Sequence, residues 1–159
     1  MDIYGHKQEA VKMLNEVLTS ELTAINQYFV HGEMYNNWGY ERLYGLLRKH
    51  SMGEMKHAEE LIERVLYLGG VPNVQRLGKI TLGENVEEAM RLDLELEKEA
   101  IPRLNTFIAE LRGFGDNGSA ELLVEILQEE EEHLDWIDAQ LAQIEQMGIQ
   151  NYLATQVRG

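Results

Sequence analysis

Hydrophobic residues recur every three to four positions along most of this chain, which is the period of a helix with one buried face. No segment shows the alternation of hydrophobic and polar residues that is typical of a strand. The pattern therefore predicts an all-α protein with four long helices and a short fifth one. Their expected ranges are about 7–36, 40–68, 85–112, 120–147 and 149–156.

The connections between these segments predict how the helices are arranged. A short turn at Gly39 makes the first two helices antiparallel, and a short glycine-rich turn does the same for the last long pair. Residues 69–83 have no period, so we expect a long surface crossover from the second helix to the third. Pro102 lies inside the third helix, where it should kink the helix or remove one hydrogen bond. Ser119 is the expected N-cap of the fourth helix.

Each of the four hydrophobic stripes is interrupted near its middle by a glutamate. In the second and fourth helices a histidine follows three residues later, which places both groups side by side on one face. The six residues are Glu21, Glu54, His57, Glu97, Glu130 and His133. Buried carboxylates that lack a partner cost several kcal/mol and repel one another, and bound cations remove both problems. Carboxylate and imidazole ligands suit Fe(II), so the pattern predicts a catalytic two-metal site with Glu54 and Glu130 as bridges.

Other residues near these stripes are open to more than one interpretation. Tyr28 lies two turns beyond Glu21 on the same face. Three roles are open for it: a hydrogen-bond donor to a ligand, an electron donor, or an ordinary core residue. Trp136 is expected to pack beside His133, more as a core residue than as part of the site. The remaining histidines are not expected to be ligands; they are His6, His31 and His50.

Composition narrows the classes of protein that fit this site. The formal net charge of −14 argues against nucleic acid as a partner and favours cations. The chain has no cysteine, which excludes disulfides and thiolate metal sites. No run approaches the roughly 18 apolar residues of a membrane span. The first twelve residues also lack the apolar stretch of a secretory signal, so we expect a cytoplasmic protein.

Several segments resemble the bacterioferritin family, in the same order and over nearly the whole chain. They are SELTAINQYFVH, EMKHAEELIERVLYLGGVPN, LGKITLGENVEE, DLELE, EEEEHLDW and QMGIQNYL. The resemblance implies one ferritin-like domain over residues 1–159, with the four-helix bundle at about 7–147. It also implies a homo-24-mer built from two-fold dimers. Each subunit would oxidise Fe(II) with oxygen or hydrogen peroxide at the same six residues, and the shell would store and detoxify iron as Fe(III) mineral.

The resemblance further implies haem b shared between two subunits, with Met55 of each as its ligand. Met55 is rotated by about 100° from Glu54 around the helix, so it points away from the bundle core. The haem would assist iron release by taking electrons from an external reductant protein. Lys12, Arg48 and Lys49 are candidate docking residues for that partner.

Three positions depart from the pattern of some family members. Lys49 and Gly53 stand where those members carry a histidine and an aspartate of an inner-wall iron site, and Leu61 replaces a tyrosine. The iron route into the cavity and the electron source are therefore open. Two other functions are also open: a soluble di-iron oxidase or peroxidase without storage, and a non-enzymatic scaffold or haem carrier. The short helix from Ile149 is expected to line a four-fold pore.

Overall fold

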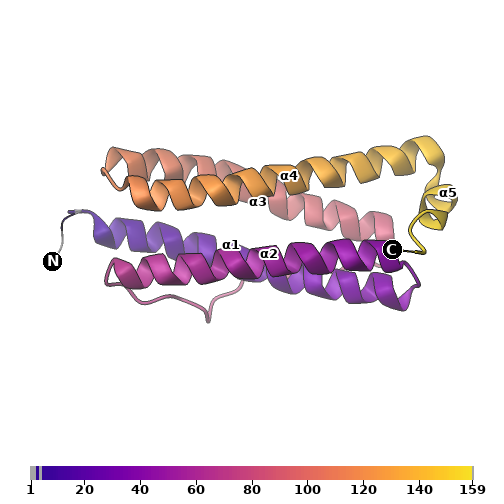
Figure 1. Cartoon of the computed structure of the whole chain (residues 1–159), viewed down its shortest axis with the longest axis horizontal. Coiled ribbons are helices and arrows are strands. Elements are labelled where there is room, and N and C mark those ends of the chain that lie inside the picture. Colours follow the sequence, from indigo (N-terminus) through magenta and orange to yellow (C-terminus); the bar gives the residue numbers. More distant parts are fainter. Residues whose placement is uncertain (1–2, 4, 159) are drawn as a thin grey trace.

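The computed structural model describes residue 3 and residues 5–158, and this part of the chain folds into five helices without a strand (Figure 1). The helices are α1 (Lys7–Asn37), α2 (Glu41–Tyr67), α3 (Val86–Gly113), α4 (Asn117–Met147) and α5 (Ile149–Ala154). The prediction of an all-α bundle with a short fifth helix is confirmed. Residues 1–2, 4 and 159, which belong to the predicted domain, lie outside the described residues.

The four long helices lie side by side, and α5 packs across one end of the bundle (Figure 1). Gly39 has a φ of 92°, which lets the chain turn tightly from α1 into the antiparallel α2. A long segment without helix joins α2 to α3 along the outside of the bundle, as the missing periodicity predicted. Within the described residues, no helix combines the length and apolar character needed to cross a bilayer.

The hydrophobic core is divided into two clusters, one toward each end of the bundle. The first draws on all four long helices, for example Leu14, Leu61, Leu104 and Leu123. The second does the same at the end near α5, for example Tyr28, Leu47, Met90 and Ile137. Each fully buried aliphatic side chain contributes roughly 1.5–3 kcal/mol. The two clusters therefore hold the helices together on both sides of a polar layer at mid-height.

The start of α4 differs from the prediction. Asp116, and not Ser119, is the N-cap, and the helix begins at Asn117 instead of Ala120. The Asp116 side chain accepts from the Ser119 backbone N–H at 3.1 Å and from the Ser119 hydroxyl at 2.6 Å. Arg64 also donates to Asp116 at 2.8 Å. The carboxylate is favoured because its negative charge suits the helix N-terminus and has a cationic partner. Pro102 lies inside α3, as predicted.

The crossover is attached to α1 through a regular series of hydrogen bonds. Three α1 side chains, spaced four residues apart, each accept from a backbone N–H of the crossover. The three bonds are Gly78 N to Thr23 Oγ1 (2.8 Å), Thr81 N to Gln27 Oε1 (3.1 Å) and Gly83 N to His31 Nε2 (3.0 Å). Because i and i+4 positions share one face of a helix, this series holds the crossover parallel to α1.

Candidate metal centre

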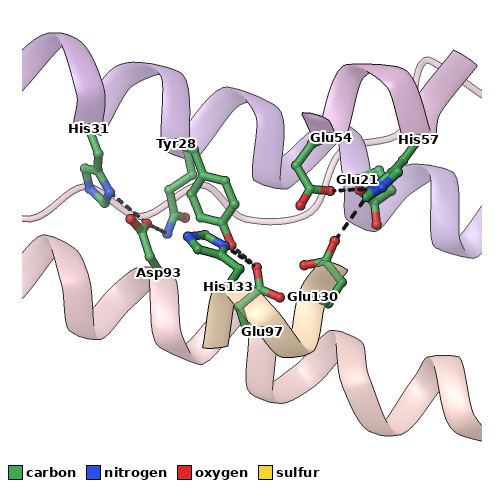
Figure 2. A network of polar contacts seen from close by, with 10 residues as sticks. Glu21, Tyr28, His31, Glu54, His57, Asp93, Glu97, Glu130 and His133 are labelled. Carbon is green, nitrogen blue, oxygen red and sulfur yellow. Dashed lines mark hydrogen bonds and ion pairs between the residues drawn. The ribbon is translucent and has the colours of Figure 1, made fainter. Parts of the chain in front are cut away.

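The six residues predicted as ligands meet in the polar layer between the two hydrophobic clusters (Figure 2). Each is at most 4% exposed; they are Glu21, Glu54, His57, Glu97, Glu130 and His133. Figure 2 shows Glu21, Glu54 and His57 pointing toward one another from α1 and α2, with Glu130 opposite them. The i, i+3 spacing brings each histidine onto the same side of its helix as the glutamate before it.

The donor atoms fall into two groups that share one residue. The first group is Glu21, Glu54, His57 and Glu130, and the second is Glu97, Glu130 and His133. Within each group, one ligand atom from every member lies within 4.8 Å of the others. Glu130 belongs to both groups, while Glu54 belongs to the first alone. The geometry therefore suits two cations with the Glu130 carboxylate between them.

His57 is the centre of the first group. Its Nδ1 lies 3.4 Å from Oε2 of both Glu21 and Glu54, and 3.9 Å from Oε1 of Glu130. Its other nitrogen, Nε2, lies 2.6 Å from Oε2 of Glu129. Burial acts to lower the pKa of His57, but the contacts with Glu54 and Glu129 outweigh it and raise that pKa.

The second group is organised around Glu97. His133 Nδ1 lies 3.2 Å from Glu97 Oε1, and the Tyr28 hydroxyl donates a short hydrogen bond to the same oxygen. The rings of Tyr28 and His133 also meet in a T-shaped arrangement, with 4.8 Å between the ring centroids. Burial raises the pKa of Tyr28, and the charges of Glu97 and Glu130 raise it further. Tyr28 is therefore a neutral donor that fixes the orientation of Glu97.

The electrostatics of the cluster favour cations. Burial raises the pKa of Glu130 well above its ordinary value, and repulsion from Glu54 and Glu97 adds to this effect. Among the residues that the structure describes, three buried side-chain atoms of this cluster have no hydrogen-bond partner: Glu97 Oε2, Glu130 Oε1 and His133 Nε2. An unsatisfied buried polar atom costs about 1–3 kcal/mol. Cations bound by Glu97 and Glu130 would relieve this cost, so the donor set fits metal ions.

Two features of the surroundings were missed by the sequence analysis. Asp93 Oδ1 accepts from Gln27 Nε2 at 2.9 Å and pairs with His31 Nδ1 at 2.8 Å, so His31 belongs to a buried network that links the crossover to α3. The sequence feature that could have indicated this network is the position of Asp93, one turn before Glu97 on the same face.

Glu129 was also missed, because it begins a run of four glutamates that resembles a solvated surface.

The other histidines lie outside the donor groups. His50 packs against His133, with 3.6 Å between the ring centroids. Burial lowers the pKa of His50 to about 3, and the neighbouring His133 adds to that lowering, so His50 is neutral. His6 stacks on Phe114 with ring centroids 4.5 Å apart. Trp136 lies beside His133, with 6.1 Å between the ring centroids.

Two cavities reach the centre from opposite faces of the bundle. A cavity of about 380 Å³ lies between α1, α3 and the crossover, and Glu21, Glu97 and Glu130 are among its lining residues. A second cavity of about 440 Å³ lies between α2 and α4 and is lined partly by Glu54 and Glu129. Lys49, His50, Gly53 and Glu132 also line the second cavity. Small reactants therefore have an approach from either side.

Met55 lies outside the cluster, as its position on the helix predicted. Its side chain is 49% exposed, and Met52, one turn earlier on α2, is 57% exposed. Lys12 and Arg48 are exposed as well. Lys49 is exposed and lines the second cavity.

The bundle has four antiparallel helices and one long crossover. Carboxylates from all four helices and histidines from α2 and α4 meet at mid-height. This combination defines a ferritin-like protein. The ferritin-like domain family matches residues 11–147. Bacterioferritin of Mycobacterium leprae is 44% identical over 92% of both chains. Bacterioferritin of Streptomyces coelicolor is 44% identical over 92% of this chain and 88% of its own. A bacterial ferritin of a Synechocystis species is 38% identical over 95% of this chain and 97% of its own. The chain therefore belongs to the bacterioferritin family.

Proposed function

We propose that this protein stores iron: it oxidises Fe(II) at the buried centre and keeps the Fe(III) product as mineral inside a shell of 24 copies. The observation that carries the proposal is the pair of buried donor groups joined through Glu130. Relatives named bacterioferritin and bacterial ferritin support the storage role. The net charge of −14 supports it too, because an acidic wall attracts iron and favours mineral formation.

The centre would act on iron as a substrate. Two Fe(II) ions are held by the two donor groups, and the four carboxylates balance their charge. Carboxylate oxygens are hard ligands that stabilise Fe(III) more than Fe(II), so the site favours oxidation. Each Fe(II) gives up one electron. The electron pair and two protons convert oxygen to hydrogen peroxide, or hydrogen peroxide to water.

The role of Tyr28 in this reaction would be to orient Glu97. Its hydroxyl donates to the Glu97 oxygen that also contacts His133, so the second donor group has one preferred arrangement. The two hydrophobic clusters close both ends of the carboxylate layer, while the two cavities give small reactants access from its sides.

Haem would serve iron release. Two exposed thioethers, Met52 and Met55, lie on one face of α2, and a two-fold axis beside that face would bring Met55 from two subunits together. Thioether is a soft ligand that favours ferrous haem, so the haem would pass electrons inward from an external reductant protein. Lys12, Arg48 and Lys49 are the exposed basic residues proposed for docking, and Lys49 also lines the cavity between α2 and α4.

The substitution Glu130→Ala tests the centre. It removes the carboxylate shared by both donor groups, so the fast phase of Fe(II) oxidation, followed by ferric absorbance in stopped flow, should disappear. Glu131→Ala is the matched control, because Glu131 is the exposed neighbour on the same helix. An unchanged fast phase in Glu130→Ala, with the shell intact by native mass, would refute the proposal.

The same measurements separate storage from the alternative, a di-iron oxidase or peroxidase that keeps no iron. A storage protein has the mass of 24 subunits and retains ferric mineral after repeated Fe(II) additions. An oxidase would show oxidation at the centre with a small native mass and no retained iron.

A further inference from the structure

The two histidines of the centre, His57 and His133, differ in the contacts of Nε2, the ring nitrogen that faces away from the other donor residues. We propose that Glu129 orients His57 and thereby makes the His57 half of the centre the tighter metal site, which fills first. This inference rests on the proposed metal centre. It concerns a residue outside both donor groups, so Glu129 would be a positioning residue.

The first observation is the contact between Glu129 and His57. Glu129 Oε2 lies 2.6 Å from His57 Nε2, while the opposite nitrogen, Nδ1, faces Glu21 and Glu54. An imidazole that donates its Nε2 proton to a carboxylate keeps the lone pair on Nδ1. The carboxylate also makes the imidazole a stronger ligand. Once a cation displaces the proton from Nδ1, the Glu129 contact therefore keeps His57 in the orientation in which it binds that cation between Glu21 and Glu54.

The second observation is that His133 has no such support. Its Nδ1 faces Glu97 at 3.2 Å, so a cation in that group would require the proton to sit on Nε2. Nε2 of His133 is buried, and no described residue offers it a hydrogen bond. Its neighbour is the ring of His50. Metal binding by His133 therefore leaves a buried N–H without an acceptor, which opposes binding.

The third observation is the Glu130 carboxylate, which belongs to both donor groups. When the first cation binds in the His57 group, it takes up part of the Glu130 charge, so less of that charge remains for the His133 group. The outer support of His57 and the sharing of Glu130 therefore both predict ordered filling.

Glu129 itself is suited to a test, because its side chain is 56% exposed and forms no part of the core. The loss of an outer partner of a metal-bound histidine typically reduces metal affinity by 10–100-fold. Glu132 provides a matched control. It lies one turn along the same helix, is exposed and lines the same cavity, and its replacement removes the same charge.

The experiment uses the intact metal-free shell and Co(II) as the probe. Titration followed by the visible d–d absorption gives affinity and stoichiometry, and anomalous scattering from crystals with one Co(II) per subunit shows which half is filled. We expect the first Co(II) at the His57 half in the wild type. In Glu129→Ala the affinity of this step should fall by 10–100-fold and the Co(II) signal should spread over both halves. Glu132→Ala should behave as the wild type.

Three results would overturn the inference. They are a wild-type protein that fills the His133 half first, a Glu129→Ala variant that titrates as the wild type, and an equal loss of affinity in Glu132→Ala. Failure of the metal centre itself would be distinguishable, because the wild type would then bind fewer than two Co(II) ions per subunit.

Discussion

Glu130 combines deep burial, two carboxylate neighbours and membership of both donor groups. Its raised pKa means that the folded, metal-free chain binds this proton more tightly than the unfolded chain does. The corresponding stability is fully present below the pKa of an unfolded glutamate, near 4.5, and is lost as the pH rises toward the folded pKa. Each unit of pKa elevation corresponds to about 1.4 kcal/mol.

The substitution Glu130→Gln should therefore stabilise the metal-free protein, because glutamine resembles the protonated acid at every pH. We expect its melting temperature in EDTA to exceed that of the wild type by a margin that grows from pH 5 to pH 8. Differential scanning calorimetry measures this margin. Glu131→Gln, on the exposed neighbour, should show no such trend. A margin that stays constant with pH would contradict the raised pKa of Glu130.

At the scale of single residues, the sequence predicted which side chains lie together where their spacing along one helix determines it. The two Glu-x-x-His pairs and the two single glutamates were predicted because each interrupts a hydrophobic stripe. Glu129 was not predicted, because its partner His57 is on another helix and four consecutive glutamates look alike in sequence. The packing of α2 against α4 decides which of the four meets His57.

At the scale of elements, the crossover depends on close contact with the start of α3. A Cβ atom built on Gly83 would lie 2.3 Å from the Ala89 backbone nitrogen and 2.6 Å from its Cα. Backbone atoms of a helix cannot move aside as a side chain can. Only glycine therefore allows the Gly83 N–H to reach His31, which in turn pairs with the buried Asp93.

We expect Gly83→Ala to push the crossover away from α3 and to cost about 1–3 kcal/mol or more, as overpacking does. Thermal unfolding in EDTA measures the cost. Gly113→Ala is the control, because nothing lies within 4 Å of a Cβ atom at Gly113. Equal melting temperatures for the two variants would show that the contact with Ala89 is unimportant.

The existence and order of the helices were predictable, because their periodic stretches are long and glycine or proline separates them. The start of α4 was not, because Asp116 and Ser119 are both good capping residues three positions apart. In the structure they bond to each other, and the cation Arg64 from α2 favours the aspartate as the cap. A contact between helices thus decides a boundary that local sequence leaves undecided.

At the scale of the whole molecule, the exposed methionines of α2 bear on the proposed haem. Met55→Leu keeps the volume of the side chain and removes the sulfur. We expect it to lose haem, measured by the Soret absorbance per subunit, and to slow reductive iron release. Assembly and Fe(II) oxidation should be unchanged, because Met55 lies outside the buried cluster.

Met52→Leu is the matched control, because Met52 lies one turn away on α2 and is also exposed. It should retain the haem and the wild-type rate of iron release. Full haem occupancy in Met55→Leu would refute the ligand assignment. Loss of haem without an effect on release would refute the electron path.

The 24-subunit shell was expected from the resemblance alone, since hydrophobic periodicity describes how one chain buries its own surface. An interface of ordinary composition differs little from the rest of a protein surface. Exposed apolar side chains on the crossover, such as Val71 and Val74, are compatible with contacts between copies but do not specify their symmetry.

The division of the core into two clusters has a consequence for the proposed shell. Each cluster includes residues of all four long helices, and within the described part of the chain the groups that could hold a cation lie in the layer between them. The relative positions of the helices are thus set by contacts that do not involve the cargo. The proposed shell of such subunits would therefore keep its dimensions while iron enters and leaves it.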